Sequence, residues 1–231
     1  MGLFHFDLNT LPFRVIAFVI AFSMHEWAHA FIAYRLGDNT AKNEGRLTLN
    51  PIPHLDPFGL LMILFGPFGW ARPVPFNPYN FRGNKRLGIV CVAAAGPFVN
   101  LVLAFFFSFL WFYIQTPFWA DMMASWPAKG LEAVSLTLEY CILINCAMLV
   151  FNMLPIAPLD GSKILRYILP HKCSGFFDKL DLYGPWLLLL IVFLPPLRGL
   201  LSVPLGIVLS WIQSITRYMV IQLFYNMIAM K

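Results

Sequence analysis

The sequence predicts an all-α polytopic membrane protein, with about five to six transmembrane helices and a re-entrant or extended membrane-associated segment between the first two full spans. Of its 231 residues, 59% are hydrophobic and 12% are charged, whereas ordinary soluble domains carry about 25% charged residues. The mean hydropathy is +0.71. Several apolar runs also reach the roughly 20 residues that a helix needs to cross a bilayer.

The predicted spans follow the apolar runs in order. Residues 11–34 form the first span, residues 87–114 the second and residues 131–154 the third. The last apolar tract, 184–228, is long enough for two further spans. Their edges are not defined, because four prolines interrupt this tract: Pro185, Pro195, Pro196 and Pro204.

The short apolar stretch 58–70 contains three glycines and one proline, and turn-rich segments flank it. Loop charges favour a re-entrant segment here over a full span, because they then follow the positive-inside rule. In that arrangement the basic residues on one side are Arg35, Lys42, Arg46, Arg72, Arg82, Lys85, Arg86, Lys163, Arg166, Lys172 and Lys179. The opposite loop, 115–130, contains only Lys129. We therefore expect loops 35–86 and 155–183 to be cytoplasmic.

Composition also excludes several other classes. The formal net charge of +5 and the pI near 9.1 do not predict a nucleic-acid partner, because the basic residues lie in loops between apolar runs. Three of the four cysteines lie in apolar runs and none forms a CxxC pair, so neither disulfides nor a cysteine-ligated metal are expected. The N-terminus does not fit a cleaved signal peptide, so the first apolar run is expected to remain in the mature protein.

Two histidines and a glutamate interrupt the first apolar run, within "SMHEWAHAFIAYRL" at 23–36. Ionisable groups at membrane depth are costly and usually face a functional interior. His25 and His29 are four residues apart, so they lie on one helical face and can reach the same ion. Glu26 is close enough to reach a metal-bound water. This H-E-x-x-H pattern predicts two zinc ligands and a general base, although a solvated helix can carry it by chance.

A catalytic zinc needs a third protein ligand. The candidates are His5, His54, His171 and Asp160. Asp160 lies in "FNMLPIAPLDGSKIL", just after the third predicted span, at the same cytoplasmic depth as His25 and His29. The residue types alone leave two alternatives for Asp160, since aspartate is also a favoured N-cap for a short helix over residues 162–169.

The motifs "HEWAHA" and "NMLPIAPLDG" together resemble those of the site-2 protease family of intramembrane zinc metalloproteases. The similarity extends to "GRLTLNPIPHLDPFG", "GWARPVPFNP" and "AAAGPFVN", and it covers about residues 20–165. The chain resembles the compact bacterial and archaeal members that lack a PDZ domain. Its tail from residue 170 onward carries no recognised motif.

The resemblance implies roles for particular residues. His25, His29 and Asp160 would hold one zinc ion per chain, and Glu26 would be the catalytic base. Asn152 would position the substrate backbone or stabilise the oxyanion, although an interhelical hydrogen bond is the alternative for an asparagine in a membrane bundle.

Other stretches that share the family resemblance carry weaker expectations. His54 and Asp56 fit either groups that support the metal ligands or turn-forming residues. Gly96, Pro97 and Asn100 are expected to serve helix packing or a kink rather than chemistry. The segment 46–57 resembles an extended, membrane-inserted region whose edge could pair with an unwound substrate strand.

The predicted protein is therefore a single integral membrane metalloprotease domain over residues 1–231, with a catalytic core at about 11–170 and C-terminal helices at 184–228. It would cleave transmembrane proteins in or near their membrane segments. Its predicted location is the cytoplasmic (inner) membrane, with the active site toward the cytoplasm and the lipid bilayer as its other partner.

Two alternatives remain open. The chain could be a membrane scaffold or transporter-like protein with a non-catalytic metal site. It could also be an enzyme that cuts soluble or lipidated peptides at the membrane surface. Glu26 favours a protease, because a pure binding site has no evident need for a carboxylate beside its ligands.

Overall fold

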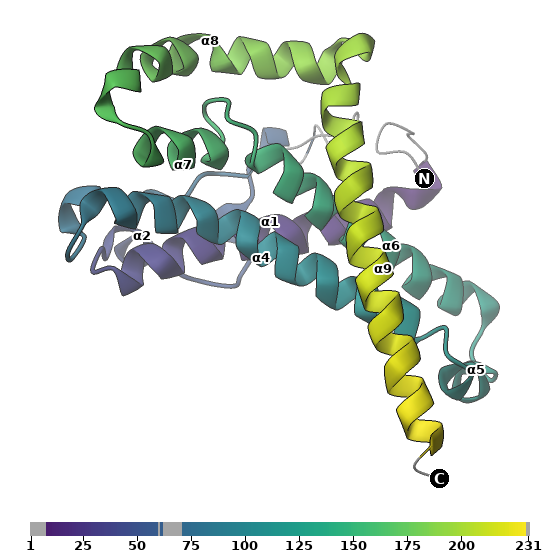
Figure 1. Cartoon of the computed structure of the whole chain (residues 1–231). Coiled ribbons are helices and arrows are strands. Elements are labelled where there is room, and N and C mark those ends of the chain that lie inside the picture. Colours follow the sequence, from purple (N-terminus) through teal and green to yellow (C-terminus); the bar gives the residue numbers. More distant parts are fainter. Residues whose placement is uncertain (1–7, 60, 62–70, 230–231) are drawn as a thin grey trace.

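The computed structural model describes residues 8–59, 61 and 71–229, and the regular structure of these residues is helical (Figure 1). The α-helices are α1 (Leu11–Arg35), α2 (Thr40–Asn43), α4 (Lys85–Tyr113), α5 (Pro117–Met123), α6 (Ala128–Asn152), α7 (Asp160–Ile168), α8 (Ser174–Phe193) and α9 (Gly199–Ala229). Short 3-10 turns lie at Leu8–Thr10, Ile52–His54, Pro78–Asn80, His171–Cys173 and Pro195–Leu197. The predicted all-α class is confirmed for the described part of the chain.

Four described helices are long and apolar enough to cross a membrane: Leu8–Arg35, Lys85–Tyr113, Ala128–Asn152 and Gly199–Asn226. The chain is thus a membrane protein, but the predicted count of five to six spans is higher than these four. The difference lies in α8, which begins before the predicted apolar tract and carries Asp178, Lys179 and Asp181 in its first half. The predicted re-entrant stretch 58–70 falls largely outside the described residues.

Helices α1, α4 and α6 form the core of the bundle. Figure 1 shows α1 and α6 running in the same direction and α4 running the opposite way. Small buried side chains let these helices approach closely: Ala17 of α1 packs with Tyr140 and Cys141 of α6, and Ala104 of α4 packs with Cys146. Lipid tails are as apolar as helix side chains, so the hydrophobic effect does not drive membrane helices together. Close packing between small residues contributes to their association instead.

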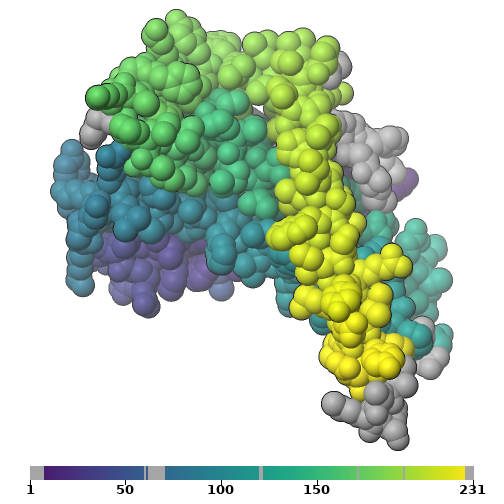
Figure 2. Space-filling model, in the orientation of Figure 1, coloured from purple at the N-terminus to yellow at the C-terminus, as the bar shows by residue number. Residues whose placement is uncertain are grey.

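The C-terminal helices α8 and α9 lie on one side of this core (Figure 1). The long helix α9 packs against α4 and α6 through Ile212, and its C-terminal end extends beyond the other helices (Figures 1 and 2). A buried hydrogen bond of 2.6 Å joins Ser108 of α4 to Thr216 of α9. Pro195 and Pro196 lie in the 3-10 turn between α8 and α9, where the chain turns sharply from one helix into the next (Figure 1).

The connection after α1 is held by one carboxylate. Asp38 is fully buried and accepts hydrogen bonds from Thr40 N and Oγ1, from Asn77 N and from Asn80 Nδ2, at 2.6–3.1 Å. Gly37 precedes it with φ of 105°, a conformation that favours glycine. This arrangement anchors the extended segment 71–77 beside α1, where it reaches the site described next.

Candidate metal centre

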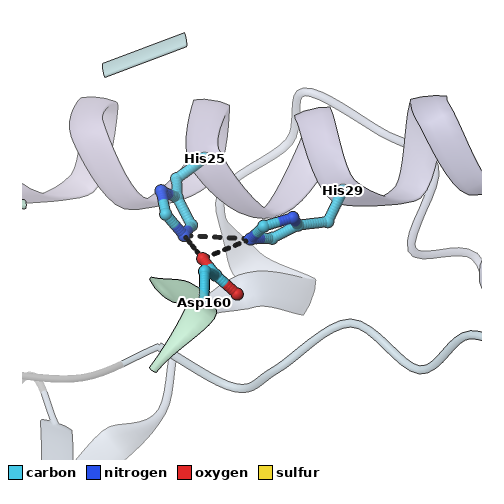
Figure 3. Close-up of side chains that lie close together, drawn as sticks. All are labelled: His25, His29 and Asp160. Carbon is cyan, nitrogen blue, oxygen red and sulfur yellow. Dashed lines mark hydrogen bonds and ion pairs between the residues drawn. The ribbon is translucent and has the colours of Figure 1, made fainter. Parts of the chain in front are cut away.

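His25 and His29 direct their rings toward one point on the inner face of α1 (Figure 3). Both are buried, and their Nε2 atoms are 3.0 Å apart. The four-residue spacing produces this approach, because it places the two side chains one helical turn apart. Asp160 at the start of α7 completes the group, with Oδ2 3.2 Å from His25 Nε2 and 3.1 Å from His29 Nε2. No ion or other ligand belongs to the structure.

The far nitrogen of each imidazole is already engaged. His25 Nδ1 lies 2.6 Å from Asn100 Oδ1, and His29 Nδ1 lies 2.7 Å from Val92 O. Both partners are hydrogen-bond acceptors, so each Nδ1 carries the hydrogen and donates it. Each Nε2 of a neutral ring therefore presents a lone pair toward the shared point, which is the state that a metal ligand needs.

A tight turn brings Asp160 to the histidines. Gly161 lies against the end of α6, where an added Cβ would stand 2.5 Å from the carbonyl oxygens of Met153 and Leu154. Asp160 does not cap α7 with its side chain, which was the alternative reading of this residue. Its Oδ1 accepts a hydrogen bond of 3.2 Å from Lys163, while its buried Oδ2 accepts none from the described residues.

Burial alone would raise the pKa of the Asp160 carboxyl, but a proton on the imidazole pair would hold that pKa well below its usual range, through the charge of His29 and hydrogen bonding with both rings. When both rings are neutral, a carboxylate oxygen and two imidazole lone pairs repel one another at 3.0–3.2 Å, so the arrangement favours a positive charge among them, either a proton or a metal ion.

These donors fit zinc. Two nitrogens and one oxygen are a common zinc donor set, and bonds of ~2.0–2.1 Å at tetrahedral angles separate ligand atoms by about 3.3 Å. The three ligand atoms are 3.0–3.2 Å apart, so they would need to move only slightly away from one another to reach this separation. Gly96 of α4 leaves room for this, since a Cβ there would stand 2.6 Å from both Nε2 atoms. Three protein ligands leave a fourth position for water or substrate.

Glu26 is buried beside His25 and contacts a different part of the chain. Its Oε2 accepts a hydrogen bond of 2.9 Å from Val74 N. Val74 stands between Pro73 and Pro75 in the segment "RPVPFNP", so it supplies the one backbone N–H between Arg72 and Phe76. The same segment accepts a hydrogen bond from buried Arg46 at Arg72 O. The Val74 N–H thereby holds the Glu26 side chain beside His25.

Two other predicted site residues lie outside the cluster of metal-ligating atoms. Asn152 is the last residue of α6, half-buried, and its amide donates to Met148 O at 3.1 Å. His54 is fully buried in a 3-10 turn, where its Nε2 donates to Thr48 O at 2.8 Å and its backbone oxygen accepts from Arg72 N. His54 therefore builds the turn that pairs with the segment beginning at Ala71.

The sequence reasoning missed the residues that surround the ligands. The sequence predicts a packing role for Gly96 and Asn100, whereas Gly96 makes space for the two rings and Asn100 hydrogen-bonds to one of them. Asn145, which hydrogen-bonds to Asn100 at 2.9 Å, was not singled out at all. A polar side chain at membrane depth is the signal that could have identified both asparagines.

Comparison with known proteins gives a consistent result. The model of peptidase family M50 matches residues 122–192. The chain is 40% identical over 201 residues to "Putative zinc metalloprotease YwhC" of Bacillus subtilis, covering 87% of this chain and 89% of that protein. It is 28% identical over 180 residues to "Putative zinc metalloprotease Rip2" of Mycolicibacterium smegmatis, covering 70% and 62%. No solved structure matches.

Proposed function

The chain belongs to peptidase family M50, the site-2 protease family of zinc metalloproteases, and from this membership we propose that it hydrolyses peptide bonds in or near transmembrane segments of other membrane proteins. The observation that carries the proposal is the convergence of His25 Nε2, His29 Nε2 and Asp160 Oδ2 within 3.2 Å of one another inside a membrane bundle. These three residues would hold one zinc ion per chain.

Zinc, when bound, would supply Lewis acidity and make water a nucleophile near neutral pH. The protein's own contribution begins with orientation. The hydrogen bonds from His25 Nδ1 to Asn100 and from His29 Nδ1 to Val92 keep both rings in the ligating tautomer. Asp160 provides the negative charge that the two neutral rings lack.

Glu26 would act as the general base. Its carboxylate receives the Val74 N–H at Oε2, which fixes the side chain against rotation. Glu26 would take the proton of the attacking water and later deliver it to the leaving amine, the task that a positioned carboxylate performs in general acid–base catalysis. Asn152 would contact the substrate backbone or its oxyanion, and His54 would support the site through the turn it builds.

The location of the site supports a cytoplasmic approach for water and substrate. His25 and His29 lie in the C-terminal half of α1, and Asp160 follows the C-terminal end of α6. The loops at these ends contain the basic residues that the positive-inside rule places in the cytoplasm. Residues 47–54 form bends and a 3-10 turn rather than the extended segment that the resemblance implied, and they join the next segment through a single bridge between Leu55 and Ala71. The extended segment 71–77, which contacts Glu26 through Val74, would instead receive a substrate strand.

The metal content of the detergent-purified full chain tests the site. We expect about one zinc per chain in the wild type and clearly less in Asp160→Ala, while Asp178→Ala, an exposed carboxylate on α8, should keep the wild-type content. A folded wild type without zinc would contradict the proposed function. Full zinc content in Asp160→Ala would remove Asp160 from the ligand set.

A further inference from the structure

Two asparagines lie in line behind His25, and the proposed mechanism uses only the first of them, Asn100. Asn100 of α4 and Asn145 of α6 are both fully buried. Asn100 Oδ1 is 2.6 Å from His25 Nδ1, Asn145 Oδ1 is 2.9 Å from Asn100 Nδ2, and Asn145 Nδ2 is 2.8 Å from Cys141 O. A line of hydrogen bonds therefore runs from the backbone of α6, through α4, to a ring of α1.

The direction of each hydrogen bond follows from its neighbours. A backbone carbonyl only accepts, so Asn145 turns its amide nitrogen to Cys141 O and its oxygen to Asn100. Asn100 then directs its nitrogen to Asn145 and to Ala21 O, at 3.3 Å, and its oxygen to the imidazole. His25 Nδ1 must donate the remaining hydrogen bond, which leaves the Nε2 lone pair for the metal.

The two histidines differ in this respect. The Nδ1 of His29 meets Val92 O, a backbone group that no side-chain substitution removes. The tautomer of His25 depends on side chains alone. A reversed Asn100 amide would present an N–H to Nδ1 and leave the ring hydrogen on Nε2, aimed at the metal position. Asn100 and Asn145 are fully buried, so bulk water has no direct access to replace the missing partner.

We propose that Asn100 and Asn145 are positioning residues that hold His25 in its metal-binding tautomer and thereby set the zinc affinity of the site. Asn100 acts directly on the ring, and Asn145 acts through Asn100 by fixing the orientation of its amide. This inference rests on the proposed function, because it concerns the same metal centre. It adds a dependence of that centre on a helix residue 15 positions before Asp160.

The test is a titration of zinc affinity in the detergent-purified full chain, by competition with a chelator of known zinc affinity. Asn100→Leu and Asn145→Leu should each weaken zinc binding about 10- to 100-fold, the usual effect of losing an outer-shell partner. Asn100→Asp should bind zinc within about tenfold of wild type, because a carboxylate still accepts from Nδ1 although it loses the donor to Asn145 and Ala21 O.

The matched control is Ser108→Ala. Ser108 is another fully buried polar residue of α4, and its hydrogen bond to Thr216 joins two helices without touching the site. Ser108→Ala should leave zinc affinity unchanged while lowering the stability of the bundle to a similar degree. The thermal unfolding temperatures of the metal-free variants compare these losses of stability.

The outcomes separate the two proposals. The positioning role is overturned if both leucine variants bind zinc with wild-type affinity, or if Ser108→Ala weakens zinc binding equally. The proposed function still stands in that case, provided that zinc binding depends on Asp160. If the leucine variants do not fold, Asn100→Asp decides, and a more than tenfold loss of affinity there overturns the inference. A folded wild type that binds no zinc overturns both.

Discussion

The chemistry of the site depends on where individual protons lie. Three electron-pair donors point at one another inside the bundle, and each is fixed from behind: His25 by Asn100, His29 by Val92 O, and Asp160 by Lys163 at its other oxygen. Glu26 stands beside them with its carboxylate on the Val74 N–H. Because every ligand has a second partner, the geometry exists before a cation arrives, and little reorganisation is needed for binding.

We expect Glu26→Gln to reduce peptide cleavage by about 10²–10⁴-fold, since glutamine cannot take a proton from water. Glutamine retains an oxygen that accepts from Val74 N, so the zinc content should stay near that of the wild type. The measurement is the cleavage rate of a single-span model substrate together with metal analysis. Glu132→Gln, an exposed carboxylate on α6, is the control and should cleave normally. Near wild-type cleavage by Glu26→Gln would refute the general-base role.

We expect Gly96→Ala to weaken zinc binding by at least tenfold, because its new methyl group would stand 2.5 Å from His25 Cε1 and 2.6 Å from both ligand nitrogens. The rings can escape only by leaving the metal position. Gly206→Ala in α9 is the control, since an added Cβ meets nothing within 4 Å there. Chelator competition measures the affinity of both variants. Equal affinities would show that the rings have room to move.

Helices and their connections decide which side chains can meet. The segment after α1 carries Asp38, which ties Thr40, Asn77 and Asn80 to the end of the helix. That clamp places residues 71–77 beside α1, and so it positions the Val74 N–H that holds Glu26. Proline on both sides of Val74 restricts the backbone to an extended form, so this N–H is presented with little freedom.

We expect Asp38→Asn to lower the free energy of unfolding at pH 7 by about 1–3 kcal/mol, the range for buried hydrogen bonds to a charged group. Burial raises the pKa of the Asp38 carboxyl, but hydrogen bonds from Thr40, Asn80 and Asn77 outweigh it and lower the pKa. Stability from this group is therefore present above its unfolded pKa of about 3.9 and declines as pH falls through the folded pKa.

Unfolding of wild type and Asp38→Asn should accordingly differ most at neutral pH and converge below about pH 4. Asp178→Asn provides the comparison, because its ion pair with Arg166 is exposed and should contribute less than about 1 kcal/mol. A gap between wild type and Asp38→Asn that stays constant down to pH 3 would contradict the clamp.

The complete chain shows which features a sequence can predict and which it cannot. The pairing of His25 with His29 is set by helical spacing alone, so it was predictable from local pattern. The meeting with Asp160, 131 residues after His29, needed the family motif. Asn100 and Asn145 could not be placed, because their contact with His25 depends on how three helices are rotated against one another. Helix α8 begins before the predicted apolar tract, because charged residues in its first half and apolar residues in its second half share one helix.

A metal held by residues so far apart in sequence links folding of α1 to the turn before α7. If zinc binds the folded chain and not the unfolded chain, it should stabilise the fold by RT ln(1 + [L]/Kd), where [L] is the concentration of free zinc. This is about 4 kcal/mol when free zinc is 1,000 times Kd. We therefore expect a strong chelator to lower the thermal unfolding temperature of the wild type. The chelator should have no effect on His25→Ala, which lacks one ligand, at any zinc concentration that saturates the wild type. Ser108→Ala should keep the full chelator effect, because its hydrogen bond lies away from the site. Equal chelator effects in wild type and His25→Ala would mean that the stabilising metal binds somewhere other than this cluster.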